Sequence, residues 1–387
     1  MTDRIPSLLV ISHACSRAVN RQPYADLRDL GWRVRVVTAD ALLQEGGRSL
    51  ASDPQQAGAP EVAFLPLLGR SSRSYRFAGL QRQIAEVRPD WVIADNDPHS
   101  FLALQLAHWK QRYGYRLGFV SCENLPFTTK QLWQRRGWRG LLLGLACAAL
   151  RPLVRPRTDL VWTINEAGLG LFRAAGFRRV LKTPLGFPAE HFFVDPHRRA
   201  AIRAQLALDG PVIAYFGRLS AEKGVHLLLD ALESLPGAWS LMIDEFMPVG
   251  EYQRGIWQRL EAPAWSQRVR WIRAGHGEVA AYMNAADIVV LPSVSTPQWV
   301  EQYGRVAPEA MACGCVVIAA DSGALPELVG DAGYLFAEGD IVALRARLAE
   351  ALAGLPDSQE LRSRAAERAR ELLSSQAQAR LWTAALS

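Results

Sequence analysis

The chain has 387 residues, of which 49% are hydrophobic and 21% are charged, and its formal net charge is +6. This composition is ordinary for a soluble globular protein, and the length favours two domains because one hydrophobic core rarely serves so long a chain. Five scattered cysteines give neither a disulfide framework nor a zinc-binding cluster, so a reducing, cytoplasmic compartment is expected.

The charge is divided unevenly along the chain. Residues 1–185 contain 26 Lys and Arg against 14 Asp and Glu, whereas the remaining 202 contain 18 against 24. A basic half followed by an acidic half predicts two domains with different partners.

The N-terminal half alternates short apolar runs, which predict strands, with longer stretches of helical character. The first run is too short for the core of a signal peptide, and no stretch of the chain reaches the ~20 apolar residues that cross a bilayer. The predicted strands are Leu8–Ser12, Val34–Thr38, Trp91–Ala94 and Leu117–Val120, and the predicted helices include Tyr24–Leu30 and Phe101–Tyr113. Such alternation is typical of a parallel sheet with helices on both faces.

The same alternation starts again in the C-terminal half. The predicted strands there are Val212–Phe216, Ser240–Ile243, Val269–Ile272, Ile288–Leu291 and Val316–Ala319. Proline and glycine between 184 and 188 predict a linker, and the Ala- and Arg-rich tail from Ser358 predicts one long helix or two. We therefore predict two α/β, doubly wound, Rossmann-like domains, 1–185 and 186–370, and a helical tail, 371–387, that can pack back on the first domain.

A polar loop follows the predicted strand Ile288–Leu291 and delivers Gly304 to the start of a helix. Free N–H groups at such a helix start suit a phosphate or a sugar hydroxyl. Glu301 precedes this helix and Glu309 lies inside it, where their carboxylates could bond a sugar and a ribose. Taken alone, two carboxylates at this spacing are a common chance pattern of surface charges.

Two cations follow the predicted strand Val212–Phe216. Arg218 and Lys223 flank a tight turn, and Gly224 opens the next helix. Cations at the carboxyl end of a strand can neutralise a diphosphate leaving group through charge-assisted hydrogen bonds. Without a further match, they would be interpreted as ordinary solvated surface charges.

Both segments together resemble a known family. The run EQYGRVAPEAMACG, from Glu301 to Gly314, resembles the donor-site signature of the group 1 (family 4) retaining glycosyltransferases, E-x-F-G-x-x-x-x-E-A-M-A-x-G, with Tyr303 in place of the usual Phe. The upstream run GRLSAEKG, from Gly217 to Gly224, is similar to the family's G-R-L-x-x-x-K-G. The resemblance implies the GT-B architecture, in which two facing Rossmann-like domains bind the acceptor (N-terminal) and the nucleotide-sugar donor (C-terminal) with a cleft between them.

The resemblance also implies roles for single residues. Arg218 and Lys223 would stabilise the departing diphosphate while Glu301 positions the donor sugar, and these three are the catalytic candidates. The donor-binding candidates are Gly217, Gly275, Ser293, Tyr303, Gly304, Arg305, Val306 and Glu309, with Glu309 on the ribose and the backbone amides of 304–306 toward the sugar and the distal phosphate. Asp287 is expected to brace its strand. Neither a metal nor a cofactor is expected beyond the nucleotide-diphosphate sugar, which is a co-substrate.

The chain departs from the family pattern mainly on the acceptor side. It lacks the glycine-rich loop after the first strand, the histidine after the fourth strand, and the G-x-G-P that follows the second strand of the donor domain. Either the diphosphate contact of that last loop is lost, or Gly250 replaces it from another register. The acceptor-side candidates are His13, Asn20, Asp95, Asp97, His99, Glu123 and Asn124, with Asp95, Asp97 and His99 expected at the rim of the cleft.

A basic and apolar stretch runs from Lys130 to Arg157. It carries seven cations and no acid, interleaved with Leu132, Trp133, Trp138 and the run 141–150. Arginine and tryptophan bordering an apolar patch are typical of a helix on a membrane surface, and an ordinary core helix with solvated arginines is the equal alternative. We predict peripheral attachment to anionic membrane and a saccharide or lipid-linked acceptor. Nucleic acid is not expected, because no recognition motif accompanies the charge.

The expected reaction is glycosyl transfer with retention at the anomeric carbon, in cell-surface polysaccharide, lipopolysaccharide or glycolipid biosynthesis. Two alternatives stay open. One is a nucleotide-sugar epimerase or a phosphorylase on the same fold, and the other is a sugar-nucleotide-binding protein that has lost catalysis. An NAD-type oxidoreductase is disfavoured because no strand is followed by G-x-G-x-x-G.

Overall fold

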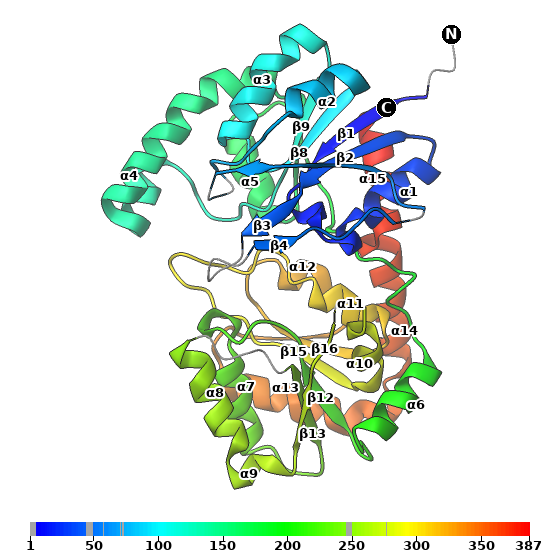
Figure 1. Cartoon of the computed structure of the whole chain (residues 1–387). Helices are drawn as coiled ribbons and strands as arrows, with labels where there is room; N and C mark the ends of the chain where they lie inside the picture. The colour runs from blue at the N-terminus through cyan, green and yellow to red at the C-terminus, as the bar shows by residue number, and fades with distance from the viewer. Residues whose placement is uncertain are drawn as a thin grey trace. The chain divides into compact units, whose positions relative to one another are not determined.

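The computed structural model describes residues 5–43, 49–56, 58–69, 71, 73–244, 250–275 and 277–387. The chain divides into two compact units: unit 1 comprises Met1–Pro188 and Ser375–Ser387, and unit 2 comprises Ala189–Ser374. In each unit, helices cover both faces of a parallel sheet (Figure 1). The predicted class, α/β with two doubly wound parallel sheets, is confirmed. The boundaries predicted at 185/186 and 370/371 lie a few residues before these divisions.

The sheet of unit 1 grows outward from a central strand, β1 (Ser7–Ile11), in both directions. On one side lie β2 (Arg33–Ala39) and β5 (Glu61–Leu65); on the other lie β8 (Trp91–Asp95), β9 (Arg116–Ser121), β10 (Leu160–Thr163) and β11 (Val180–Lys182). All these pairs are parallel, and Leu8 sits opposite both Val34 and Trp91. Side chains of β1 are buried on both sheet faces, which explains why this strand is an unbroken apolar run.

Six longer helices accompany this sheet: α1 (Gln22–Asp29), α2 (Leu80–Val87), α3 (Phe101–Tyr113), α4 (Thr129–Val154), α5 (Glu166–Ala174) and α15 (Ser375–Leu386). Two short antiparallel pairs, β3 (Ala41–Leu43) with β4 (Ser49–Ala51) and β6 (Leu67–Leu68) with β7 (Arg76–Phe77), lie outside it. Helix α3 has the expected bounds because Ser100 caps its first turn and Gly114, in a left-handed conformation, ends it.

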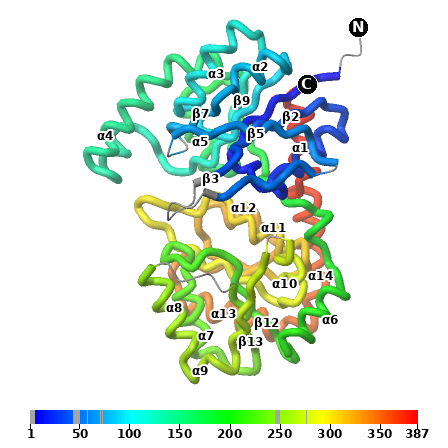
Figure 2. Tube along the Cα trace, in the orientation of Figure 1, coloured from blue at the N-terminus to red at the C-terminus, as the bar shows by residue number. Residues whose placement is uncertain are grey.

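The C-terminal helix α15 packs in unit 1, beside α1 (Figure 2). Its Trp382 is fully buried and stacks on Trp162 with ring centroids 4.2 Å apart. The Trp382 indole donates a hydrogen bond to the Thr183 hydroxyl over 3.0 Å, and the Trp91 indole donates to the Leu386 carbonyl over 3.0 Å. Two large aromatic side chains and two satisfied indole donors therefore fix this helix in the unit.

The sheet of unit 2 has the order β14 (Val269–Ile272), β13 (Ser240–Asp244), β12 (Val212–Tyr215), β15 (Ile288–Leu291), β16 (Val316–Ala320) and β17 (Tyr334–Phe336), and every pair is parallel. The chain leaves β12 toward β13 and β14, then returns to place β15 on the other side of β12. The strand order therefore reverses between β12 and β15, which makes the carboxyl ends of these two strands a topological switch point.

The helices of unit 2 are α6 (Pro196–Gln205), α7 (Val225–Glu233), α8 (Glu251–Glu261), α9 (Pro263–Ser266), α10 (Val279–Ala285), α11 (Val306–Ala312), α12 (Leu325–Val329), α13 (Ile341–Gly354) and α14 (Gln359–Arg368). The predicted helical tail consists of two helices, α14 and α15. A π-helical segment, Ala369–Leu373, and the extended Ser374 separate them.

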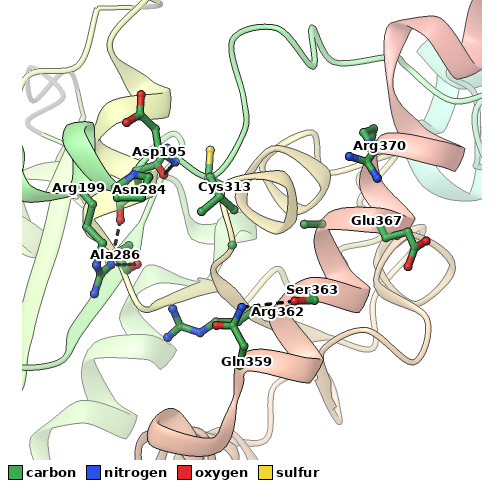
Figure 3. A pocket seen from close by; sticks show the side chains of 14 residues that line it. Asp195, Arg199, Asn284, Ala286, Cys313, Gln359, Arg362, Ser363, Glu367 and Arg370 are labelled. Carbon is green, nitrogen blue, oxygen red and sulfur yellow. Dashed lines mark hydrogen bonds between the residues drawn. The ribbon is translucent and has the colours of Figure 1, made fainter.

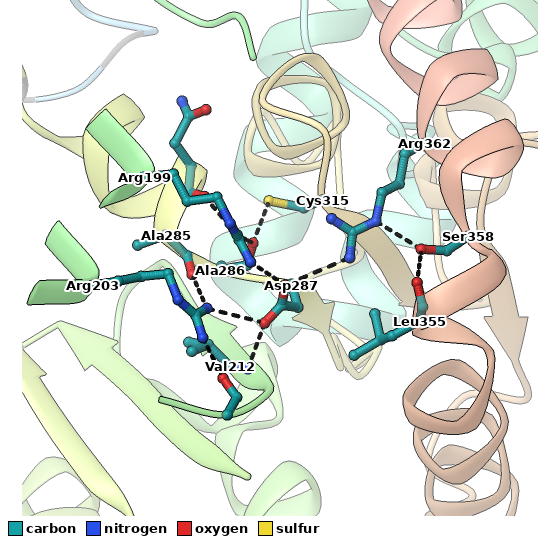
Figure 4. A network of polar contacts seen from close by, with 12 residues as sticks. Arg199, Arg203, Val212, Ala285, Ala286, Asp287, Cys315, Leu355, Ser358 and Arg362 are labelled. Carbon is teal, nitrogen blue, oxygen red and sulfur yellow. Dashed lines mark hydrogen bonds and ion pairs between the residues drawn. The ribbon is translucent and has the colours of Figure 1, made fainter. Parts of the chain in front are cut away.

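Asp287, at the amino end of β15, is a bracing residue, as predicted. It is buried, and its carboxylate accepts hydrogen bonds from the Arg199 guanidinium over 2.6 Å and from the Val212 backbone N–H over 2.8 Å. Arg203 reaches the second carboxylate oxygen over 3.3 Å, and Arg362 of α14 approaches to 3.6 Å (Figure 4). The network ties α6 and α14 to the amino-terminal edge of the sheet.

Candidate functional site

The catalytic candidates of unit 2 meet at the switch point between β12 and β15. Lys223 lies in the loop after β12, and Glu301 lies in the loop after β15, while the two strands pair directly at Ile213 and Ile288. Ligands of open parallel sheets bind outside the carboxyl ends of the strands at such a point. The motifs that are far apart in the sequence are therefore brought to one place by the strand order.

Lys223 and Glu301 form an ion pair, which their separate assignment from the sequence did not anticipate. The Lys223 Nζ atom lies 2.6 Å from Glu301 Oε2, and the Ser293 hydroxyl donates to the same oxygen over 2.8 Å. Lys223 Nζ also lies 4.8 Å from the centre of the Trp299 ring. Glu301 is buried, and its carboxylate, which the Ser293 hydroxyl bonds in turn, holds the Lys223 ammonium group at the carboxyl ends of the strands.

Arg218 is the exposed cation of the site. Its side chain is 64% exposed, and its guanidinium lies 3.7 Å from Glu222, too far for a strong hydrogen bond. The backbone beneath it is fixed, because the buried Tyr215 hydroxyl donates to the Arg218 carbonyl over 2.7 Å. The structure thus gives Arg218 a rigid attachment and a side chain that is accessible to an anionic ligand.

Two glycines permit the close approach of the site loops. A Cβ at Gly224 would lie 1.7 Å from the Pro292 carbonyl oxygen, and a Cβ at Gly323 would lie 2.1 Å from the Glu301 carbonyl oxygen. Both residues have positive φ, +68° and +56° respectively, which side chains disfavour. These contacts press the loop after β12 and the loop before α12 against the backbone that carries Ser293 and Glu301.

Glu309 of α11 is buried without a strong ion pair. Burial raises its pKa from 4.5 to about 7, and Arg305, whose Nε lies 3.7 Å away, opposes the shift. The neighbouring Tyr303 is also buried. Gly304 and Arg305 directly precede α11, a short helix of seven residues, and Val306 is its first residue. The predicted contacts of these three amides with a sugar and a phosphate stay predictions.

The remaining donor-side candidates lie in two loops of unit 2. Gly217 lies two residues after the end of β12, and the Gly275 N–H, after β14, donates to the Glu278 carboxylate over 3.0 Å. The G-x-G-P position and most of the turn around it, 245–249, lie outside the described residues, as does His276. Gly250 is described; its N–H donates to the Gln253 side chain at the start of α8.

Unit 1 gathers polar side chains at its own switch point, between β1 and β8. The Ser12 hydroxyl donates to Asp95 over 2.7 Å, and the Ser121 hydroxyl, at the end of β9, donates to Asp97. Both serines were missed from the sequence as site residues, although each ends or directly follows a predicted strand. Asp95 and Asp97 are therefore brought together with hydroxyl donors at one edge of the sheet.

Glu123 also lies at this edge and pairs with Arg73 over 3.2 Å. Burial, together with the nearby Asp97, raises the pKa of Glu123, and Arg73 lowers it. Arg73 lies in the loop before β7, far from Glu123 in sequence. No local pattern could have indicated this pair.

His99 does not lie at an open rim, and that expectation is corrected. Its imidazole is buried against Phe127 and Phe172, with ring centroids 4.4 Å and 5.7 Å away, and its Nε2 atom has no hydrogen-bond partner. Burial lowers its pKa from 6.5 to about 4. His99 is thus a neutral side chain of the packed interior, just before the Ser100 cap of α3.

The other acceptor-side candidates are held by local contacts. His13, after β1, packs edge-on against Tyr75 with ring centroids 5.3 Å apart. The Asn20 amide donates to the Ala14 carbonyl over 2.7 Å, and Asn124 is buried. Among the residues that the structure describes, no group of three or more His, Cys, Asp or Glu side chains is placed to hold a metal ion.

A cavity of about 500 Å³ lies at the opposite, amino-terminal edge of the unit 2 sheet (Figure 3). Asp195, Arg199 and Asn284 line one side of it, and Arg362 and Arg370 line the other. None of the donor-side candidates lines it. The cavity lies at the amino ends of β15 and β16, whereas the candidate site lies at the carboxyl ends of β12 and β15. The two are therefore separate.

Fold and site together define a class of protein: an α/β protein with two parallel sheets and, at the switch point of the second sheet, a lysine paired with a buried carboxylate and an exposed arginine in the same loop as the lysine. Residues 198–372 match the family model described as glycosyl transferases group 1. This matched part, which is less than half of the chain, carries Arg218, Lys223, Glu301 and Glu309. The resemblance found in the sequence is confirmed.

Solved structures with the same fold span nearly the whole chain. A crystal structure of Anabaena Alr3699/HepE in complex with UDP has a TM-score of 0.72 at 20% identity and covers 98% of this chain and 99% of that one. Sucrose-phosphate synthase from Thermosynechococcus elongatus has a TM-score of 0.69 at 19% identity, covering 99% and 98%. WaaG, a glycosyltransferase involved in lipopolysaccharide biosynthesis, has a TM-score of 0.67 at 18% identity, covering 99% and 100%. At these identities the comparisons establish the GT-B fold alone.

Relatives by sequence match only part of the chain. A D-inositol 3-phosphate glycosyltransferase of Segniliparus rotundus is 35% identical over 174 residues, which are 43% of this chain and 37% of that protein. An alpha-maltose-1-phosphate synthase of Mycolicibacterium smegmatis is 32% identical over 189 residues, 46% of each chain. The matched segment therefore spans less than half the length of either relative.

Proposed function

We propose that the protein is a retaining glycosyltransferase, which moves a hexose-type sugar from a nucleotide-diphosphate sugar to an acceptor. The observation that carries the proposal is the Lys223–Glu301 ion pair at the switch point between β12 and β15, with the exposed Arg218 in the same loop as Lys223. Such a site offers two cations to a diphosphate and a carboxylate to sugar hydroxyls within one loop cluster.

In this mechanism, Arg218 and Lys223 bind the diphosphate and stabilise the negative charge that grows on it as the glycosidic bond breaks. Glu301 fixes the position of Lys223 and accepts hydrogen bonds from donor-sugar hydroxyls. Glu309 accepts a hydrogen bond from the ribose. The acceptor hydroxyl attacks from the side of the departing phosphate, which takes its proton, so the anomeric configuration is retained. No metal enters these steps.

The UDP-bound structures among the fold relatives support a nucleotide-diphosphate donor, and UDP-glucose is bound in one of them. We propose a UDP-sugar as the first donor to test. The names of the two sequence relatives contain a phosphorylated inositol and a phosphorylated maltose. Together with the excess of cations in residues 1–185, they support an anionic acceptor, either a sugar phosphate or a lipid-linked saccharide of cell-surface polysaccharide or glycolipid synthesis.

On the acceptor side, we propose that Asp95 and Asp97, aligned by the Ser12 and Ser121 hydroxyls, orient the acceptor. Carboxylates with fixed hydroxyl donors are suited to saccharide hydroxyls. Replacing Asp97 with Asn should raise the KM for the acceptor while the affinity for the donor stays unchanged.

The test is a transfer assay with radiolabelled UDP-, GDP- and ADP-sugars, each with a sugar phosphate or a lipid-linked saccharide. We expect release of nucleoside diphosphate that depends on the acceptor, and a product whose anomeric configuration, read by NMR, equals that of the donor. Turnover that needs inorganic phosphate, or turnover without an acceptor, would indicate a phosphorylase or an epimerase instead. Donor binding with no turnover under any condition would indicate a binding protein.

A further inference from the structure

Helix α4 (Thr129–Val154) is not one straight rod. Gly137 has φ +57° and ψ −140°, so two helical segments meet at a sharp bend there. A Cβ at Gly140 would lie 1.9 Å from the Leu132 carbonyl oxygen, and a Cβ at Gly144 would lie 2.5 Å from the Thr129 Cα. The glycines therefore let the second segment pack tightly against the first.

The bend bears on whether α4 could cross a membrane or lie on its surface. By length and composition, the stretch Thr129–Arg157 is long and apolar enough to cross a bilayer. A crossing helix needs ~20 continuous residues, however, and the segment from Trp138 to Val154 that follows the bend is shorter than that. A bent pair of short helices fits a membrane surface better than its interior.

The segment after Gly137 is apolar on both of its faces. Gly140, Gly144, Cys147 and Val154 are buried against the unit, and their spacing places them on one side of a helix. The opposite stripe, the Trp138 face, consists of Trp138, Leu142, Leu145 and Leu153, which are 62%, 57%, 53% and 49% exposed. Four large apolar side chains in one exposed stripe are the kind of patch that marks an interaction site.

Cations border the Trp138 face on the side of the bend. Arg139 lies over the Trp138 ring, with its Cζ atom 5.4 Å from the ring centre, and Lys130, Trp133 and Arg136 are exposed nearby in sequence. No Asp or Glu occurs between 130 and 157. Within the described part of the chain, neither Lys130, Arg136 nor Arg139 takes part in an ion pair. Each such cation near an anionic bilayer contributes about 1 kcal/mol.

We propose that the Trp138 face, with Lys130, Arg136 and Arg139, docks on the surface of an anionic lipid bilayer. The leucines enter the boundary between headgroups and acyl chains, Trp138 lies at the headgroup level, and the cations bind lipid phosphates. A second copy of the chain is a poorer occupant, because a symmetric contact would bring the same uncompensated cations face to face. The inference does not depend on the proposed transfer reaction.

Vesicle flotation with the full chain tests this proposal. We expect binding to vesicles of phosphatidylcholine and phosphatidylglycerol at low salt, weaker binding at high salt, and little binding to phosphatidylcholine alone. The triple variant Trp138→Ser, Leu142→Ser, Leu145→Ser should lose about tenfold or more in binding, and Arg136→Glu with Arg139→Glu should remove the dependence on anionic lipid.

A matched control replaces three equally exposed apolar residues elsewhere. Val342, Leu372 and Leu381 are 72%, 53% and 48% exposed, and their triple change to Ser should leave vesicle binding as in the unchanged protein. Equal melting temperatures of the two triple variants show that the loss of binding is not unfolding. Absent binding by the unchanged protein, or equal binding by both triple variants, overturns the proposal. If the unchanged protein and the control variant are dimers and the Trp138-face variant is a monomer, the face binds a second copy of the chain instead.

Discussion

At the residue scale, the candidate site depends on how Lys223 is held. Glu301, itself fixed by the Ser293 hydroxyl, pairs with it on one side, and the Trp299 ring lies close to its ammonium group, so the cation is positioned before any ligand arrives. An ammonium group that needs no reorganisation during the reaction stabilises a developing charge more strongly than a free surface lysine.

Replacing Lys223 with Ala should lower kcat by about 100- to 1,000-fold, the usual effect of losing one preorganised charge-stabilising donor. Glu301→Gln should lower kcat as well, because the lysine loses its anchor. The measurement is steady-state transfer with saturating donor. Arg254→Ala, which removes an exposed cation of α8, is the control and should behave as the unchanged protein. Near-normal turnover of Lys223→Ala would remove charge stabilisation from the mechanism.

Glu309 predicts a pH dependence of stability. Because burial raises its folded pKa to about 7, above the ordinary 4.5, the neutral carboxyl favours the folded state. The stabilisation is complete below the ordinary pKa and is lost as the pH rises through about 7, by up to about 1.4 kcal/mol per pH unit. Chemical unfolding between about pH 5 and about pH 8 measures it. Glu309→Gln should flatten this dependence, and an equal slope in the variant would assign it to another group.

The sequence was informative about the donor side at this scale because its residues fall on a contiguous motif. Arg218, Lys223, Glu301 and Glu309 could be named without the structure. The Lys223–Glu301 contact could not, since it depends on β15 returning beside β12. For the same reason, Ser12 and Ser121 were missed, and His99 was misplaced by its proximity in sequence to Asp95 and Asp97.

At the element scale, Gly224 and Gly237 form a matched pair. Both have positive φ, +68° and +95°, but a Cβ at Gly224 meets the Pro292 carbonyl at 1.7 Å whereas a Cβ at Gly237 meets nothing within 4 Å. Gly237→Ala should therefore cost only the conformational penalty, about 1–2 kcal/mol. Gly224→Ala should cost more and should also weaken donor binding, because it pushes apart the loops after β12 and β15.

Denaturant unfolding and donor titration of these two variants check that prediction. Equal losses of stability with unchanged donor affinity in both variants would show that the contact between the two loops has no part in the site.

The strands that the sequence revealed are those with long apolar runs. Every predicted strand is present, and β14 and β15 have the predicted bounds. Of the strands in the two large sheets, β11 and β17 were missed because three residues are too short to show a periodicity, and β5 because it is only half-buried. The four-residue strand β10 was missed as well, although it is buried. The bend in α4 was also missed, since Gly137, between Arg136 and Trp138, is one of three glycines in this stretch and does not by itself identify a break.

At the scale of the whole molecule, α15 connects the end of the chain to unit 1. Replacing the buried Trp382 with Ala should lower the stability of that unit by about 3–5 kcal/mol, because it leaves a cavity beside Trp162 and removes the bond to Thr183. Leu381→Ala, on the exposed neighbour, should change stability by less than about 0.5 kcal/mol. Thermal unfolding followed by limited proteolysis measures both variants. Destabilisation confined to unit 2 would contradict the assignment.

The fold class and the order of the two units could be predicted from repeated strand and helix signals along the whole chain. The return of α15 to unit 1 could be stated only as an option, because a polar tail rich in alanine and arginine does not show which surface it covers. Its buried face depends on a few side chains such as Trp382 and Ala379, which contact residues far away in sequence.

We propose that unit 2 binds a nucleotide-diphosphate sugar through Arg218, Lys223 and Glu301. Isothermal titration of the full chain with UDP-, GDP- and ADP-sugars tests it most directly. We predict saturable binding of at least one donor, weakened about tenfold or more in Lys223→Ala, as expected for the loss of a charge-assisted hydrogen bond, and unchanged in Arg254→Ala. Absence of binding for every donor, or equal affinity in Lys223→Ala, would contradict the account.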